Sequence, residues 1–99
     1  MIHILKITRD LCPESLKKSF RKAAMTGGGV LRLDSELNLA DANEILERWI
    51  PLIDEGNLAF DVVRQFALHP SFSHLVTDKL VHADKVDVIE MLLSRSQQA

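Results

Sequence analysis

Closely spaced helix breaks in the second half of the chain constrain its fold more than any other sequence feature. From Asn38 onward apolar residues recur at helical spacing, with interruptions at Pro51, at "DEGN" 54–57, at "HPS" 69–71 and at Asp84. The later segments are about 10 to 13 residues long, an ordinary helix length. Because short connections make consecutive helices pack together, the pattern predicts a compact helical bundle or helix pairs of a solenoid. No internal repeat is strong enough to favour the solenoid.

Each expected helix has a candidate cap and a candidate buried face. Asn38 or Asp41 can cap the first of these helices, and Asp84 can cap the last. Proline lacks a backbone donor and clashes with the preceding turn, so we expect a kink or break after Trp49, at Ile50–Pro51. The residues expected to face the core are Ile45, Leu46, Trp49, Phe60, Val63, Phe66, Ala67, Phe72, Val76, Leu80, Val86, Ile89 and Leu93.

The first third of the chain has a different pattern. The isoleucines of "MIHILKIT" favour a short strand near residues 2–8, and "VLRL" favours a second strand near 30–33. Between them we expect a helix from Pro13 to about Met25, because proline suits the first helical position. The glycines of "TGGG" then form a turn, since a phosphate-binding loop would need Lys and Ser/Thr after the glycines at the start of a helix.

Length and composition place the chain among ordinary globular proteins. It has 99 residues, of which 46% are hydrophobic and 26% charged, so we expect a single helical domain spanning 1–99. The predicted fold is mainly α, with about four to five short helices and a small N-terminal β element. No apolar run approaches the roughly 18 residues that cross a bilayer, and the N-terminus lacks signal-peptide features. The single cysteine, Cys12, fits a reducing compartment, so we expect a soluble cytoplasmic protein without a membrane partner.

Charge is divided unequally along the chain. Residues 1–32 carry seven Lys/Arg and two Asp/Glu, whereas residues 33–99 carry five and twelve. Four cations fall on the side of the expected helix opposite its apolar stripe of Leu16, Phe20, Ala23 and Ala24. These candidate partner-binding residues are Lys17, Lys18, Arg21 and Lys22. They meet either the acidic part of the same chain or a carboxylate-rich surface of a partner protein.

The function class that we favour is non-catalytic protein–protein interaction, as an adaptor, chaperone, inhibitor or small subunit. The expected partner is another protein or a second copy of this chain, as a homo-oligomer. Apolar residues that widen the helical stripes would add a docking surface: Leu37, Leu39, Ile50, Leu52, Leu58, Val88, Met91 and Leu92. The alternative is a nucleic-acid-binding regulatory protein that uses the basic face of helix 13–25. A pI of about 6.0 and the lack of aromatic residues beside the cations make nucleic acid the weaker alternative.

Sequence signatures of catalysis are absent. No HExxH, CxxC or Walker pattern occurs, and we expect neither an enzyme nor a cofactor. His74, Asp78 and His82 share one face of an expected helix, but further ligands are missing nearby, so we expect no tight divalent metal site. Cys12 precedes Pro13 at a helix start, where a thiolate is favoured. We interpret it instead as a small, half-buried residue at the edge of the apolar stripe.

Overall fold

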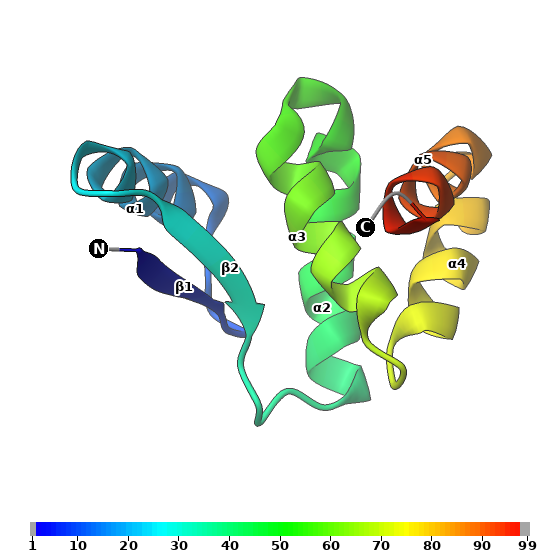
Figure 1. Ribbon diagram of the computed structural model, residues 1–99. Coiled ribbons are helices and arrows are strands. Elements are labelled where there is room, and N and C mark those ends of the chain that lie inside the picture. Colours follow the sequence, from blue (N-terminus) through cyan, green and yellow to red (C-terminus); the bar gives the residue numbers. More distant parts are fainter. Residues whose placement is uncertain (1, 98–99) are drawn as a thin grey trace.

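A small parallel sheet is followed by a group of packed helices (Figure 1). The computed structural model describes residues 2–97, with side chains placed up to residue 94. The predicted mainly α fold, with its small N-terminal β element, is confirmed. The elements in chain order are β1 (His3–Ile7), α1 (Pro13–Met25), β2 (Gly29–Leu33), α2 (Leu39–Trp49), the 3-10 helix η1 (Ile50–Glu55), α3 (Asn57–Leu68), α4 (Ser73–His82) and α5 (Val86–Gln97).

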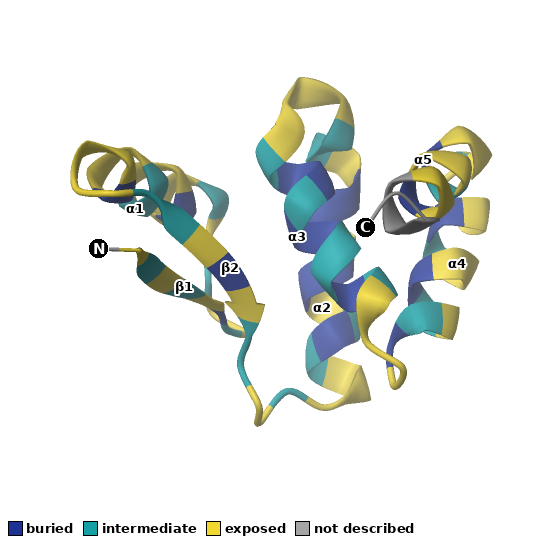
Figure 2. Ribbon diagram, viewed as in Figure 1, coloured by how far each residue is buried: buried dark blue, intermediate teal, exposed yellow. Residues whose placement is uncertain are grey.

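The sheet consists of β1 and β2 in parallel, joined through α1. Parallel strands require a long crossover, and the predicted helix from Pro13 supplies it. Ile4 lies opposite Val30, and Lys6 lies opposite Arg32. Burial alternates along both strands, so one face of the sheet contributes to the core and the other is exposed (Figure 2). In Figure 1 β2 lies between β1 and α3, which leaves β1 as the outer strand.

The apolar stripe of α1 is narrower than the sequence pattern predicted. Leu16 and Ala23 are buried and Phe20 is half-buried, but Ala24 is exposed. The prediction that Ala24 lies in the buried stripe was therefore wrong. A sheet of two strands is narrow, and the helix that packs on it buries only the residues directly above the strands.

All three glycines after α1 have a structural explanation, and the predicted turn is confirmed. Gly27 and Gly28 have φ angles of 122° and 104°, which L side chains rarely adopt. Gly28 donates its N–H to the carbonyl of Ala23 at 2.6 Å and so closes the end of α1. Gly29 begins β2, where a Cβ atom would lie 3.1 Å from Leu5 Cδ1 and 3.2 Å from Ala23 Cβ. Positive φ angles at Gly27 and Gly28 and close packing at Gly29 thus account for "GGG".

The start and end of α2 follow the local sequence. Asn38 and Asp41 form a capping box, in which each side chain accepts a hydrogen bond from the backbone N–H of the other. The helix ends at Trp49, and the chain continues as η1 from Ile50, so the break predicted at Ile50–Pro51 is confirmed. Pro51 has no N–H to continue the α-helical ladder.

The core is one cluster of buried side chains in which α3 is central. Five residues of α3 are buried, and the helix contacts β2, α2, η1, α4 and α5. Ala67 is only half-buried, but the other residues predicted to face the core on α2, α3 and α4, and at Phe72 just before α4, are buried. They are Ile45, Leu46, Trp49, Phe60, Val63, Phe66, Phe72, Val76 and Leu80.

The predicted inward face of α5 was wrong. Val86 and Leu93 are 52% and 59% exposed and Ile89 is half-buried, whereas Val88 and Leu92 are buried. Apolar residues lie on most sides of this segment, so their spacing alone does not choose a face. The packing of α5 against α4 and α3 makes the choice.

Asp84 was predicted to cap α5, and that assignment was wrong. Asp84 has a φ of 58° and follows the last turn of α4, where its N–H donates to Val81 O at 3.1 Å. Lys85 donates its N–H to Leu80 O at 2.8 Å. These two bonds form a Schellman motif, so Asp84 occupies the left-handed position that usually holds glycine.

Candidate interaction surfaces

The four predicted partner-binding cations belong to the exposed part of α1, whereas Leu16 and Ala23 are its buried residues. The side chains of this group are all exposed, as the helical pattern predicted. We call this group the α1 basic face; it consists of Lys17, Lys18, Arg21 and Lys22.

None of the cations of the α1 basic face forms an ion pair with a carboxylate among the residues that the structure describes. The ion pairs found there join Arg9 to Asp10 and Asp41, Lys79 to Glu47, and Lys85 to Asp54. Within the described residues, attraction between the basic and acidic parts of the chain therefore does not take the form of ion pairs with this face.

Several cations of the helical region, by contrast, hold elements together. Arg48 on α2 donates to the carbonyls of Arg9 at 3.0 Å and Leu11 at 2.9 Å. Lys79 on α4 reaches Glu47 on α2 at 3.0 Å, and its hydrogen bond and charge lower the pKa of that carboxyl group. These contacts connect separate elements of the fold. The α1 basic face has no such structural partner in the described part of the chain.

A second basic surface, which the sequence analysis did not single out, lies on the exposed face of the sheet. Lys6 and Arg32 are neighbours across the two strands, and both are exposed. Ile4 and Val30 lie beside them and are 57% and 43% exposed. A faint signal was present in "ILKI" and "VLRL", where a cation occupies the alternate position of each strand. Parallel sheets are usually covered on both faces, so this open face is unusual.

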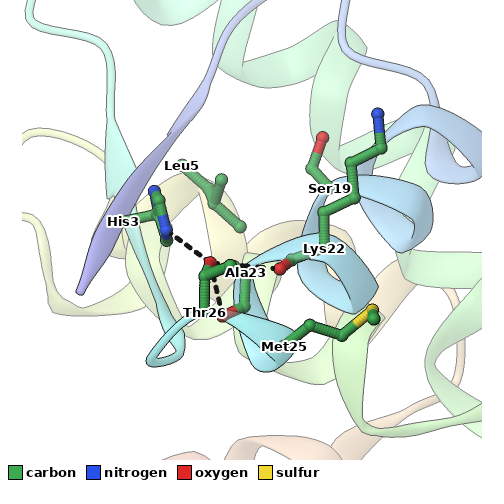
Figure 3. A pocket seen from close by; sticks show the side chains of 7 residues that line it. All are labelled: His3, Leu5, Ser19, Lys22, Ala23, Met25 and Thr26. Carbon is green, nitrogen blue, oxygen red and sulfur yellow. Dashed lines mark hydrogen bonds between the residues drawn. The ribbon is translucent and has the colours of Figure 1, made fainter. Parts of the chain in front are cut away.

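An open hollow of about 540 Å³ lies between β1 and the C-terminal half of α1 (Figure 3). His3 and Leu5 line it from the strand, while Lys22, Ala23 and Met25 are among its lining residues from the helix. No residue of β2 contributes to the lining, so the hollow belongs to the outer side of the sheet. His3 Nε2 lies 2.7 Å from Thr26 Oγ1, a hydrogen bond that ties the start of β1 to the end of α1.

The His74, Asp78 and His82 group is spread over the exposed surface of α4. Asp78 and His82 line a hollow of about 500 Å³ between α2 and α4, but His74 does not. The ring Nδ1 of His82 lies 2.7 Å from the backbone carbonyl of Asp78. Among the described residues no three His, Cys, Asp or Glu side chains are grouped to hold a metal ion. The absence of tight metal binding at this face remains a prediction, and zinc calorimetry on the parent and the His74→Ala variant tests it.

Cys12 is exposed and caps the N-terminus of α1, so the expectation of a half-buried residue was wrong. Its Sγ lies 3.0 Å from Ser15 Oγ and accepts a hydrogen bond from the Ser15 N–H at 3.4 Å. Both bonds, the side-chain bond foremost, lower the pKa of the Cys12 thiol below its usual value. The hydrogen bonds at the helix start thus favour the thiolate, and among the described residues the side-chain group bonded to the thiol is the hydroxyl of Ser15.

Most of the apolar residues proposed to widen the helical stripes belong to the core or its edge. Ile50, Val88 and Leu92 are buried, and Leu37, Leu52 and Leu58 pack partly buried against the core cluster. Leu39 and Met91 remain, with 60% and 45% exposure. They lie on different helices, α2 and α5, so these residues do not make the broad apolar surface that the sequence suggested.

Comparisons of the chain with protein-family models, with curated proteins and with solved structures give no match. No helix in the described range 2–97 has the length and apolar character needed to cross a membrane.

Proposed function

We propose that this protein is a non-catalytic protein–protein interaction module, and that the α1 basic face binds a carboxylate-rich surface of its partner. The observation that carries the proposal is the exposure of four clustered cations without an ion pair in the described part of the chain. Complementary charge on a partner would speed association and set orientation more than it would add affinity.

Protein is favoured over nucleic acid by the position of the aromatic residues. Trp49, Phe60, Phe66 and Phe72 are buried and Phe20 is half-buried. Binders of single strands combine a basic groove with aromatic side chains on which bases stack, and these rings are not exposed for stacking. Binding to the phosphates of a duplex would need only the cations, so duplex DNA is the main alternative partner.

A second copy of this chain is a further partner that the charges permit. Its acidic helical region could meet the α1 basic face, since residues 33–99 carry twelve carboxylates. Such a contact joins different surfaces on the two copies, so it would produce a ring or an open chain of copies. Sedimentation across a concentration series distinguishes this self-association from binding of another protein.

The test uses a labelled oligoglutamate peptide and a labelled DNA duplex of similar charge as probes, with fluorescence anisotropy as the measurement. The variant Lys18→Gln with Arg21→Gln removes two cations and leaves Lys22, which also lines the hollow beside β1. The control, Ser71→Glu with Thr77→Glu, changes net charge equally at exposed positions of another region.

We expect the parent and the control to bind oligoglutamate at low ionic strength, and the Gln variant to bind about fivefold more weakly or worse. Stronger binding of the duplex, with a steep salt dependence that the Gln variant loses, would establish the nucleic-acid alternative. If neither probe binds, or if the control weakens binding as much as the Gln variant, the proposal is wrong and the basic face is only solvated.

A further inference from the structure

The outer edge of β1 has unpaired backbone groups. The His3 N–H donates to Gly28 O at 2.9 Å, and Ile7 O accepts from Asp34 N at 3.0 Å, so both residues point their peptide groups toward β2. Because the direction alternates along a parallel strand, the N–H and C=O of Ile4 and Lys6 point away from β2. Neither residue has a backbone partner on that side among the described residues.

The hollow described above lies along this same edge. A strand added beside β1 would project alternate side chains toward α1 and toward the open face of the sheet. Those that point toward α1 would enter the hollow next to Leu5 and Ala23 (Figure 3). Met25 is 86% exposed at the same hollow and adds an adaptable apolar wall.

The charges beside the edge indicate the chemistry of the added strand. Lys6 and Arg32 are adjacent on the open face and have no ion pair in the described part of the chain. Lys22 lines the hollow on the other face. Carboxylates on the open-face side of a bound segment would therefore meet Lys6 and Arg32, while the side chains on its other side would enter the hollow that Lys22 helps to line.

We propose that the outer edge of β1 binds an extended, acidic segment of a partner protein by strand addition. Ile4 and Lys6 exchange backbone hydrogen bonds with the segment, an apolar side chain fills the hollow, and a carboxylate lies beside Lys6. This deepens the proposed function, on which it rests for the class of partner, by assigning a site and a backbone conformation to the bound segment. Strand addition is a general mode in which backbone bonds give affinity and pockets give specificity.

Charge also argues against a second copy of this chain as the added strand. Pairing of two β1 edges would bring a second Lys6 and a second Arg32 onto one continuous sheet and would supply no carboxylate from either strand. Lysine on an edge strand opposes such self-pairing. An acidic segment faces no such repulsion.

The probe is a labelled peptide in which glutamate and valine alternate, tested with the full chain. Two control peptides are a block sequence of the same composition and an alternating peptide that is N-methylated along one edge. We expect the alternating peptide to bind at least about tenfold more tightly than either control. It alone combines alternating carboxylate and apolar side chains with free backbone N–H donors.

Two measurements on the protein separate strand addition from simple charge attraction. Amide exchange followed by NMR should slow about tenfold or more at Ile4 and Lys6 on binding, while the His3 amide, bonded to Gly28 in the free protein, changes little. Ile4→Pro removes an outward N–H and should abolish binding, whereas Ile4→Thr retains that N–H and should bind within about threefold of the parent.

The outcomes distinguish this inference from the proposed function. Equal binding of the alternating, block and N-methylated peptides, lost in the Lys18→Gln and Arg21→Gln variant, would overturn strand addition and leave the α1 basic face as the binding surface. The amides of Ile4 and Lys6 could instead be protected from exchange already in the free protein, with protection that grows with protein concentration. That result would also overturn strand addition by a partner, in favour of self-pairing of two β1 edges. Failure of all peptides to bind would contradict both.

Discussion

Lys6 and Arg32 lie directly opposite each other in the parallel register of β1 and β2, on the face of the sheet that is exposed. Like charges in directly opposed positions destabilise a sheet. This pair lies beside the free edge of β1 and close to the exposed Ile4 and Val30. The carboxylate-binding surface proposed above would account for two cations in positions that are expected to weaken the sheet.

Charge reversal at one member of this pair should stabilise the protein. We expect Lys6→Glu and Arg32→Glu each to raise the free energy of unfolding by about 0.2 to 1 kcal/mol at low ionic strength, since each creates an opposite-charge pair. The gain should shrink as salt screens the interaction. Urea unfolding, followed by fluorescence of the single buried Trp49, measures the change. The double variant restores like charges, so a double variant that is more stable than both singles would contradict the interpretation.

Serine substitutions at two glycines should act in opposite directions. Gly28 and Gly56 both have open space around the position of a Cβ atom, but Gly28 has a φ of 104° whereas Gly56 has an extended φ of 161°. Gly28→Ser should therefore destabilise the fold by about 1 to 2 kcal/mol. Gly56→Ser should stabilise it by about 0.5 kcal/mol, because serine can cap α3, which has no side-chain cap. Thermal unfolding of both variants checks the opposite signs.

Asp84 is a position where glycine should be better than the native residue. Its φ of 58° is strained for a side chain, so we expect Asp84→Gly to stabilise the protein by about 0.5 kcal/mol. Asp84→Val should destabilise it by more than 1 kcal/mol, since β-branched residues tolerate this conformation poorly. Thr77→Gly, in the middle of α4, is the control and should cost about 1 kcal/mol. A loss of stability in Asp84→Gly would show that the aspartate side chain contributes an interaction of its own.

The thiol of Cys12 should react at lower pH than an ordinary cysteine. Because hydrogen bonds from Ser15 lower its pKa, the thiolate forms at lower pH, and alkylation by iodoacetamide should reach half its maximal rate at a correspondingly lower pH. The stability that these hydrogen bonds to the thiolate contribute is fully present above the pKa that the Cys12 thiol has in the unfolded chain. It is lost as pH falls through the lower pKa that the thiol has in the folded protein.

Ser15→Ala should move that alkylation profile toward higher pH. Ser19→Ala, one turn further along α1 and without a bond to Cys12 among the described residues, should leave the profile unchanged. Identical profiles in the parent and Ser15→Ala would show that the serine does not set the thiol pKa.

Local sequence alone determined the features that depend on neighbouring residues. Pro13 at the start of α1, the Asn38 and Asp41 capping box and the break at Pro51 each involve groups within one helical turn. The exposure of the α1 basic face follows in the same way, because cations and apolar residues alternate at the helical period within one segment.

Only the tertiary structure decided features that depend on which elements meet. The inward face of α5 could not be chosen from its spacing, because apolar residues surround the helix and its contacts with α3 and α4 select Val88 and Leu92. The assignment of Asp84 as the cap of α5 failed because a residue in a short connection can end one helix or begin the next. The hydrogen bonds from Asp84 and Lys85 back to α4 show that Asp84 belongs to the end of α4. The second basic surface and the free edge required the register that pairs Lys6 with Arg32 and the placement of β1 outside β2. Strand pairing joins residues distant in sequence, so short-range patterns predict a strand without predicting its partner or its free side.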